Sequence, residues 1–164
     1  MSARGGSGKR RDVHERALGL LGVRQRSRVE LERRLLGVGF GAQEVDAELG
    51  RLEQVGLIDD HAFARAVAEH AIRSRGEGRR AVNRRLASAG VSTAIADEVV
   101  GELIGDDEAE RALELAVSRV GRLGALTPEK AFSRLSGFLA RRGYAPDVAR
   151  WAVRKALALE SLGA

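Results

Sequence analysis

The sequence predicts an all-α fold of three tandem three-helix-bundle repeats, forming an elongated array whose curvature stays open. No segment shows the strict apolar–polar alternation of a half-buried strand. Three times, a leucine is followed four residues later by a glycine and then by Phe, Val or Tyr, at Leu35-Gly39-Phe40, Leu86-Gly90-Val91 and Leu139-Gly143-Tyr144. The glycines lie 51 residues apart (39 to 90) and 53 residues apart (90 to 143), a near-constant period that is typical of repeat proteins.

The first repeat is expected at residues 13–57, after a disordered basic tail at 1–12 that has almost nothing to bury. Its first helix places Ala17, Leu18 and Leu21 on one face. Ser27 then begins a second helix as its N-cap, with Glu30 completing a capping box. This helix should bury Leu31, Leu35 and Val38 and end at Gly39 in the left-handed conformation. A third helix follows, with apolar residues at Val45, Leu49 and Leu52, and Gly56 ends it.

The second repeat is expected at residues 58–105. Asp59 is a good N-cap for a helix lined by Phe63, Val67 and Ala71. A break at Gly76-Glu77-Gly78 precedes a second helix, near 79–89, which buries Val82 and Leu86 and ends at Gly90. Ser92 or Thr93 caps the third helix, which carries Ile95, Val99, Val100 and Leu103.

The third repeat is expected at residues 106–164. Asp106 caps a helix that contains Ala112, Leu115 and Val120. Thr127 and Pro128 form a cap and a favoured first helical position for the next helix, which holds Phe132, Leu135, Phe138 and Leu139. Pro146 opens the last helix. Each unit alone is too small to bury a sufficient core, so neighbouring repeats should pack on one another.

The composition favours a cytoplasmic protein that is not an enzyme. There is no cysteine, which excludes disulfides, thiolate zinc sites and cysteine nucleophiles. No apolar run approaches the roughly 20 residues that span a bilayer. The spacing of His61 and His70 does not suit a metal site, and acids such as Asp106, Asp107 and Glu108 are better explained by the helix dipole than by a cation. We therefore expect no cofactor.

Charge is sorted between successive helices of the second repeat. The segment at 79–89 contains four arginines and no acid, whereas the following helix contains Asp97, Glu98 and Glu102 and no base. Arg80 and Arg84 lie one helical turn apart and form a basic stripe. Such a stripe is a solvated face, a surface for a polyanion, or part of a bipolar acidic and basic surface for a charged protein. Phe40, Tyr144 and Trp151 are expected to be core or staple residues rather than base-stacking platforms, so nucleic-acid contacts would be mainly to phosphates.

A longer motif lies between Gly56 and Gly90. It consists of Gly56-Leu57-Ile58-Asp59-Asp60, then Phe63-Ala64, the stretch from Arg73 to Arg75, and finally Leu86 and Gly90. This motif resembles the signature of the RecX family, regulators of the bacterial recombinase RecA, although Val67 stands where the family often has an aromatic residue. The resemblance covers about residues 13 to 157. It implies three-helix repeats that bind along the groove of the RecA–single-strand DNA filament, limit filament growth, and damp ATP hydrolysis and strand exchange, without catalytic residues.

The resemblance and the charge pattern together define a set of expected contacts. The partners would be the RecA filament, single-stranded DNA and duplex DNA, and an array of this length can be a monomer. The candidates for contact with the filament or DNA are Arg73, Arg75, Arg79, Arg80, Arg84, Arg85, Arg33, Arg34, Arg141 and Arg142.

Two alternatives to filament regulation remain open. One is a sequence-independent nucleic-acid binder without a recombinase partner. The other is a metal-dependent nuclease that uses Asp106, Asp107 and Glu108. It is disfavoured because three adjacent residues cannot all face one side of a helix.

Overall fold

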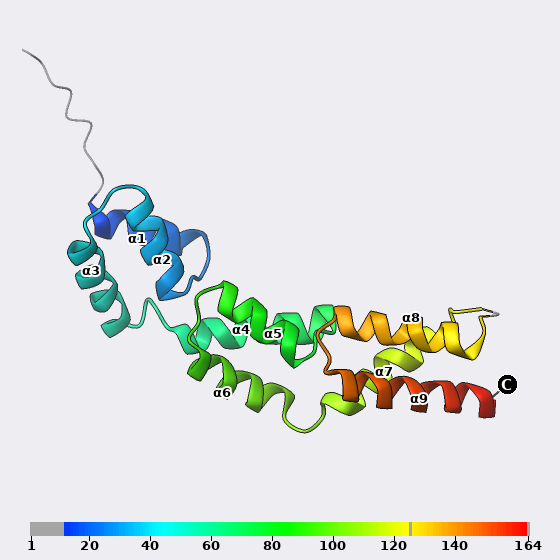
Figure 1. The fold of residues 1–164 in the computed structure, drawn as a ribbon. Helices are drawn as coiled ribbons and strands as arrows, with labels where there is room; N and C mark the ends of the chain where they lie inside the picture. The colour runs from blue at the N-terminus through cyan, green and yellow to red at the C-terminus, as the bar shows by residue number, and fades with distance from the viewer. Residues whose placement is uncertain (1–11, 125, 164) are drawn as a thin grey trace, which may run out of the picture. The chain divides into compact units, whose positions relative to one another are not determined.

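A computed structural model describes residues 12–124 and 126–163 of this chain, and within these residues all regular secondary structure is α-helical (Figure 1). The described part holds nine helices: α1 Val13–Val23, α2 Arg28–Gly37, α3 Ala42–Gln54, α4 Asp60–Arg75, α5 Arg79–Ser88, α6 Thr93–Ile104, α7 Glu108–Val120, α8 Pro128–Arg141 and α9 Pro146–Gly163. The predicted all-α fold of tandem helical repeats is confirmed. The tail predicted at 1–12 lies outside the described residues except for Asp12, which caps α1 by accepting a hydrogen bond from the Glu15 N–H at 2.7 Å.

The chain divides into two compact units. The first holds the described residues up to Phe63 together with Ala89–Val91, and the second holds Ala64–Ser88 and the described residues from Ser92 onward. In the first unit α1, α2 and α3 pack on one another around a core of Val13, Ala17, Leu31, Leu35, Val45, Leu49, Leu52 and Ile58. In the second unit α7, α8 and α9 lie side by side (Figure 1) around Ala112, Ala116, Leu135, Leu139, Tyr144, Ala152, Val153 and Ala156.

The three repeated glycines adopt the conformation that the sequence predicts. Gly39, Gly90 and Gly143 have φ angles of 96°, 81° and 84°. This left-handed region is costly for residues with a Cβ atom, which explains why glycine follows the second helix of every repeat.

Two of these glycines also lie close against a residue of another helix. A Cβ atom on Gly90 would lie 2.6 Å from the Val29 Cβ, and one on Gly143 would overlap the Ala81 backbone, 2.8 Å from its Cα. At Gly39 nothing lies within 4 Å of that position. The glycine turns of the second and third repeats are therefore docking points as well as helix ends.

Two helix starts receive a hydrogen-bond acceptor from an acid far away in the sequence. The first N–H of α2, on Arg28, donates to Asp60 Oδ1 at 2.8 Å, and the first N–H of α5, on Arg79, donates to Glu108 Oε1 at 2.9 Å. The acids are the first residues of α4 and α7. Each carboxylate therefore satisfies an N–H that has no acceptor within its own helix and complements the dipole there.

The start of α8 is capped within the same segment. Thr127 Oγ1 accepts from the Lys130 N–H at 3.5 Å, and Pro128 at the first helical position has no N–H to satisfy. This cap was predicted from the sequence. The Asp59 and Ser27 caps are confirmed as well, through hydrogen bonds from Ala62 at 2.9 Å and from Glu30 at 3.1 Å.

Three local predictions were wrong. Val38 is 55% exposed. It is the C-cap that follows the last residue of α2, Gly37, so its side chain does not continue the buried face of that helix. Leu18 is exposed because the buried stripe of α1 follows Val13 and Ala17. Asp107, not Asp106, precedes α7, and its side chain makes no cap hydrogen bond.

Candidate nucleic-acid interface

The four arginines of α5 fall into two pairs with different surroundings. Arg79 donates from Nη2 to the Gly105 carbonyl at 3.0 Å, and its Nε lies 3.9 Å from Glu108. Arg85 forms a two-point contact with Glu77, from Nε at 3.1 Å and from Nη2. These two arginines bind α5 to neighbouring segments of the second unit.

The Glu77–Arg85 pair gives the Gly76-Glu77-Gly78 loop a structural role. Glu77 is buried, and its hydrogen bond to Arg85 raises the pKa of that guanidinium. The next N–H, on Gly78, donates to the Arg142 carbonyl at 2.8 Å. The loop therefore connects α5 with the turn between α8 and α9.

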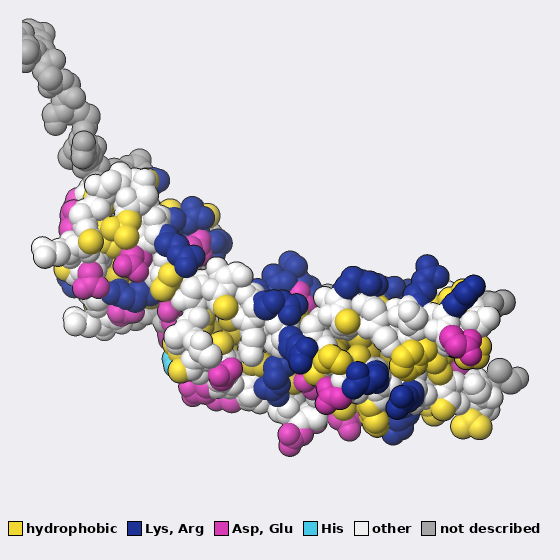
Figure 2. All heavy atoms as spheres, viewed as in Figure 1, with side chains coloured by type: hydrophobic (Ala, Val, Ile, Leu, Met, Phe, Trp, Pro, Cys, Tyr) yellow, Lys and Arg dark blue, Asp and Glu magenta, His cyan; other side chains and the backbone are white. Residues whose placement is uncertain are grey.

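Arg80 and Arg84 form the second pair and are exposed. Neither side chain makes an ion pair or a hydrogen bond with any residue that the structure describes. They lie one turn apart on α5, so both guanidinium groups are available to an external anion at once. Figure 2 shows Lys and Arg side chains gathered over α5 on the face drawn.

The turn between α8 and α9 adds further arginines to the same region of the second unit. Arg142 donates from Nη1 to the carbonyl of Arg75, the last residue of α4, and its guanidinium lies 4.6 Å from the Phe138 ring centre. The N–H of Arg80 donates to the Gly143 carbonyl at 3.1 Å. These bonds connect the turn between α8 and α9 with the end of α4 and the start of α5. Arg73, Arg75 and Arg141 are exposed.

Arg33 and Arg34 belong to the first unit, and only one of the two has a side-chain partner among the described residues. Arg33 is exposed and has no ion-pair partner among the described residues. Arg34 donates from Nε to Glu30 Oε1 at 3.1 Å. The ten candidates thus divide into arginines that stabilise the fold and arginines that are available for contact.

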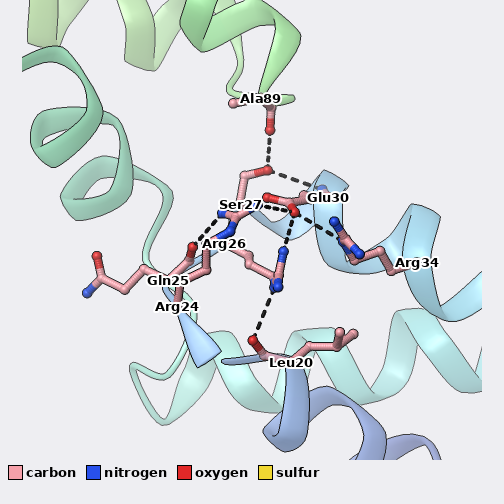
Figure 3. Close-up of polar contacts among 8 residues, drawn as sticks. All are labelled: Leu20, Arg24, Gln25, Arg26, Ser27, Glu30, Arg34 and Ala89. Atoms are coloured by element: carbon pink, nitrogen blue, oxygen red, sulfur yellow. Dashed lines mark hydrogen bonds and ion pairs between the residues drawn. The ribbon is translucent and has the colours of Figure 1, made fainter. Parts of the chain in front are cut away.

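Glu30 accepts hydrogen bonds from three arginines at once (Figure 3). Arg24 donates at 2.5 Å, the buried Arg26 also binds the Leu20 carbonyl at 3.1 Å, and Arg34 donates from the following turn. Burial of the carboxylate opposes ionisation. The hydrogen bonds from Arg24, Arg26 and Arg34 together outweigh burial and lower the pKa of Glu30. The capping box is therefore half formed, because the Glu30 side chain binds arginines and not the Ser27 N–H.

The sequence interpretation missed two groups of residues. The first is Asp60 and Glu108, whose role depends on N–H groups distant in sequence. The second is the exposed face of α9: the sequence shows that this helix is basic, through Arg150, Arg154 and Lys155, but these residues were not among the contact candidates. Nowhere in the described ranges do three histidines, aspartates or glutamates gather closely enough to hold a metal ion. Among the helices described, none has the length and apolar character that crossing a bilayer requires.

Comparison with known proteins gives the family. Models of the first, second and third three-helix domains of RecX match residues 14–52, 59–100 and 106–153. A protein named Regulatory protein RecX from Amycolatopsis mediterranei is 34% identical over 138 residues, which are 84% of this chain and 79% of that protein. The chain belongs to the RecX family. A further RecX regulatory protein, from Chlorobaculum tepidum, is 32% identical over 154 residues and covers 94% of both chains.

A solved structure supports the same assignment at the level of the fold. The crystal structure of RecX from Lactobacillus salivarius matches with a TM-score of 0.79 at 17% identity, over 88% of this chain and 94% of that one. At this identity the likeness concerns the helical arrangement alone.

Proposed function

We propose that this chain is a regulator, mainly an inhibitor, of the RecA recombinase. In this proposal it binds along the RecA–single-strand DNA filament and limits filament growth, ATP hydrolysis and strand exchange. It acts by binding alone, as a cytoplasmic monomer without a cofactor. The observation that carries the proposal is the pair Arg80 and Arg84, which has no side-chain partner within residues 12–124 and 126–163 of a chain of the RecX family.

The unpaired arginines are the proposed contacts because they can bind a new anion without losing an existing bond. Guanidinium groups suit both the phosphates and the carboxylates that a protein–DNA filament offers. Arg80 and Arg84 would contribute most, together with Arg73, Arg75 and Arg141 in the same unit. Arg33 in the first unit would add a second point of attachment. Contacts from several repeats then raise the overall affinity through effective concentration.

The remaining candidates would influence binding only through stability. Arg79 and Arg85 hold α5 against Glu108 and Glu77. Arg142 binds the carbonyl of Arg75 at the end of α4, and Arg34 is bound to Glu30. Replacing one of them removes an internal contact, so a loss of activity in such a variant would not identify the binding surface.

The test measures DNA-stimulated ATP hydrolysis by the recombinase with substoichiometric amounts of this protein. We expect inhibition by the unmodified chain and much weaker inhibition by the double variant Arg80→Glu, Arg84→Glu, with unchanged helicity. The matched control is Arg122→Glu, Arg134→Glu, which alters the net charge equally at two exposed arginines of the second unit. Equal inhibition by the two double variants would contradict the assignment of α5.

The second candidate function is sequence-independent nucleic-acid binding without a recombinase partner. The same unpaired arginines favour it, because they suit bare phosphates equally well. Titration of the protein with bare single-stranded and duplex DNA separates the two candidates. Submicromolar binding at physiological salt, without any effect on ATP hydrolysis by the recombinase, would favour this second function.

A further inference from the structure

The helix α9 presents two chemically different faces. Ala149, Ala152, Val153 and Ala156 are buried in the core of the second unit. The opposite face carries residues at helical spacing that line a shallow surface hollow: Asp147, Arg150, Trp151, Arg154 and Lys155. Three cations and one anion give this hollow a positive balance, and Figure 2 shows Lys and Arg side chains along this region.

The single tryptophan of the chain lies at the centre of this face. Trp151 is 41% exposed, so the expectation that it is a core or staple residue is wrong, whereas Tyr144 is buried and Phe40 packs against the core of the first unit. The Lys155 Nζ lies 4.9 Å from the Trp151 ring centre, within the range of a cation–π interaction. Arg150 and Arg154 flank the ring one turn apart and have no ion-pair partner among the described side chains.

This combination matches the chemistry of single-stranded nucleic acid. An exposed indole can stack on the face of an unpaired base, and adjacent cations can bind the phosphates on either side of that base. In duplex DNA the base faces are already stacked and do not reach a side chain at the surface. Lys155 has a long flexible side chain, so its ammonium group can leave the ring and bind a phosphate when a base takes its place.

We propose that this face of α9 is a base-stacking site for single-stranded DNA, with Trp151 as the platform and Arg150, Arg154 and Lys155 as phosphate contacts. It is separate from the arginines of α5. It does not depend on the proposed recombinase function, because a bare oligonucleotide suffices to occupy it.

The first experiment uses the intrinsic fluorescence of the whole 164-residue chain, since Trp151 is the only tryptophan in this sequence. Oligo(dT) is added without any recombinase. We expect saturable quenching, because a stacked base contacts the indole ring directly. An abasic oligonucleotide of equal length has the phosphates but no bases, and it should produce little quenching, as should duplex DNA. Equal quenching by oligo(dT) and the abasic strand would overturn the stacking assignment, and so would binding without any change in fluorescence.

The second experiment measures affinity by the fluorescence anisotropy of labelled oligo(dT). Trp151→Ala should weaken binding about tenfold, whereas Trp151→Phe, which keeps an aromatic face, should retain most of the affinity. The control is Leu159→Ala, at another exposed apolar residue of α9. Circular dichroism checks that each variant is folded. If Trp151→Ala binds like the unmodified protein while the α5 double variant does not, the α9 site is refuted and the α5 surface stands.

Discussion

Among single residues, Gly143 is the one whose replacement should be most damaging. Its φ of 84° disfavours any side chain, and a Cβ atom would overlap the backbone of Ala81 at the start of α5. The first effect costs about 1 to 2 kcal/mol and the second about 1 to 3 kcal/mol. We expect Gly143→Ala to lower the free energy of unfolding by about 2 to 5 kcal/mol, measured by urea denaturation.

The chain provides a matched control at Gly39. Its φ is 96°, but nothing lies within 4 Å of the added Cβ atom. Gly39→Ala should therefore show the conformational cost alone, about 1 to 2 kcal/mol. Similar losses for both variants would mean that the turn at Gly143 is not tightly packed on α5.

The carboxylate of Glu30 makes part of the stability of the first unit dependent on pH. The three arginines lower the pKa of Glu30 below its ordinary value of 4.5. The unfolded chain therefore takes up the proton first, and the stabilisation that is present above about pH 4.5 is lost as the pH falls further. Chemical denaturation between pH 3 and pH 7 should show this loss in the unmodified protein. Glu30→Gln should be less stable at pH 7, by about 1 to 3 kcal/mol, and should show a flatter profile.

Among the helices, α5 depends on an acid supplied by α7. Glu108 accepts the hydrogen bond of the Arg79 N–H at 2.9 Å, and the residue before α5 is Gly78, which has no side chain to cap it. Glu108→Ala should lower the free energy of unfolding by about 1 kcal/mol, the usual contribution of an N-terminal cap. Glu110→Ala serves as the control, because this exposed acid also lies in the first turn of α7. Urea denaturation checks both, and equal effects would argue against a specific role of Glu108.

For the whole molecule, the expected signature of function is the salt dependence of DNA binding. The net charge is +5, and contacts to phosphates release counterions from the strand. Each arginine contact should add about 0.7 to the negative slope of log affinity against log salt for a single strand. Arg80→Ala, Arg84→Ala should therefore reduce that slope by about 1.4, in titrations at several potassium chloride concentrations. Trp151→Ala should lower the affinity at every salt concentration and leave the slope nearly unchanged, since stacking releases few ions.

Much of the fold could be predicted from the sequence because it depends on local rules. The Leu-x-x-x-Gly pattern specifies a helix end that almost only glycine tolerates. Ser27, Asp59 and Thr127 each cap the helix that follows by accepting from the N–H three residues later. The candidate site could be predicted only in part. The sequence placed four arginines on α5. Contacts with Glu77, Gly105 and Glu108 decide which of these arginines already have a partner within the protein. No local rule predicts these contacts. The exposure of Trp151 likewise depends on which face of α9 meets the core.

Pro128 has a consequence for attempts to lengthen the protein by duplicating repeats. Arg28 and Arg79 each offer a free N–H to the leading carboxylate of the segment that follows, whereas Pro128 at the corresponding position of α8 offers none. Suppose that a copied module beginning with an acid equivalent to Asp60 or Glu108 were grafted after α9. Its carboxylate would find no N–H donor at Pro128. An engineer would need to exchange this proline for a residue with an amide hydrogen before the new joint could form.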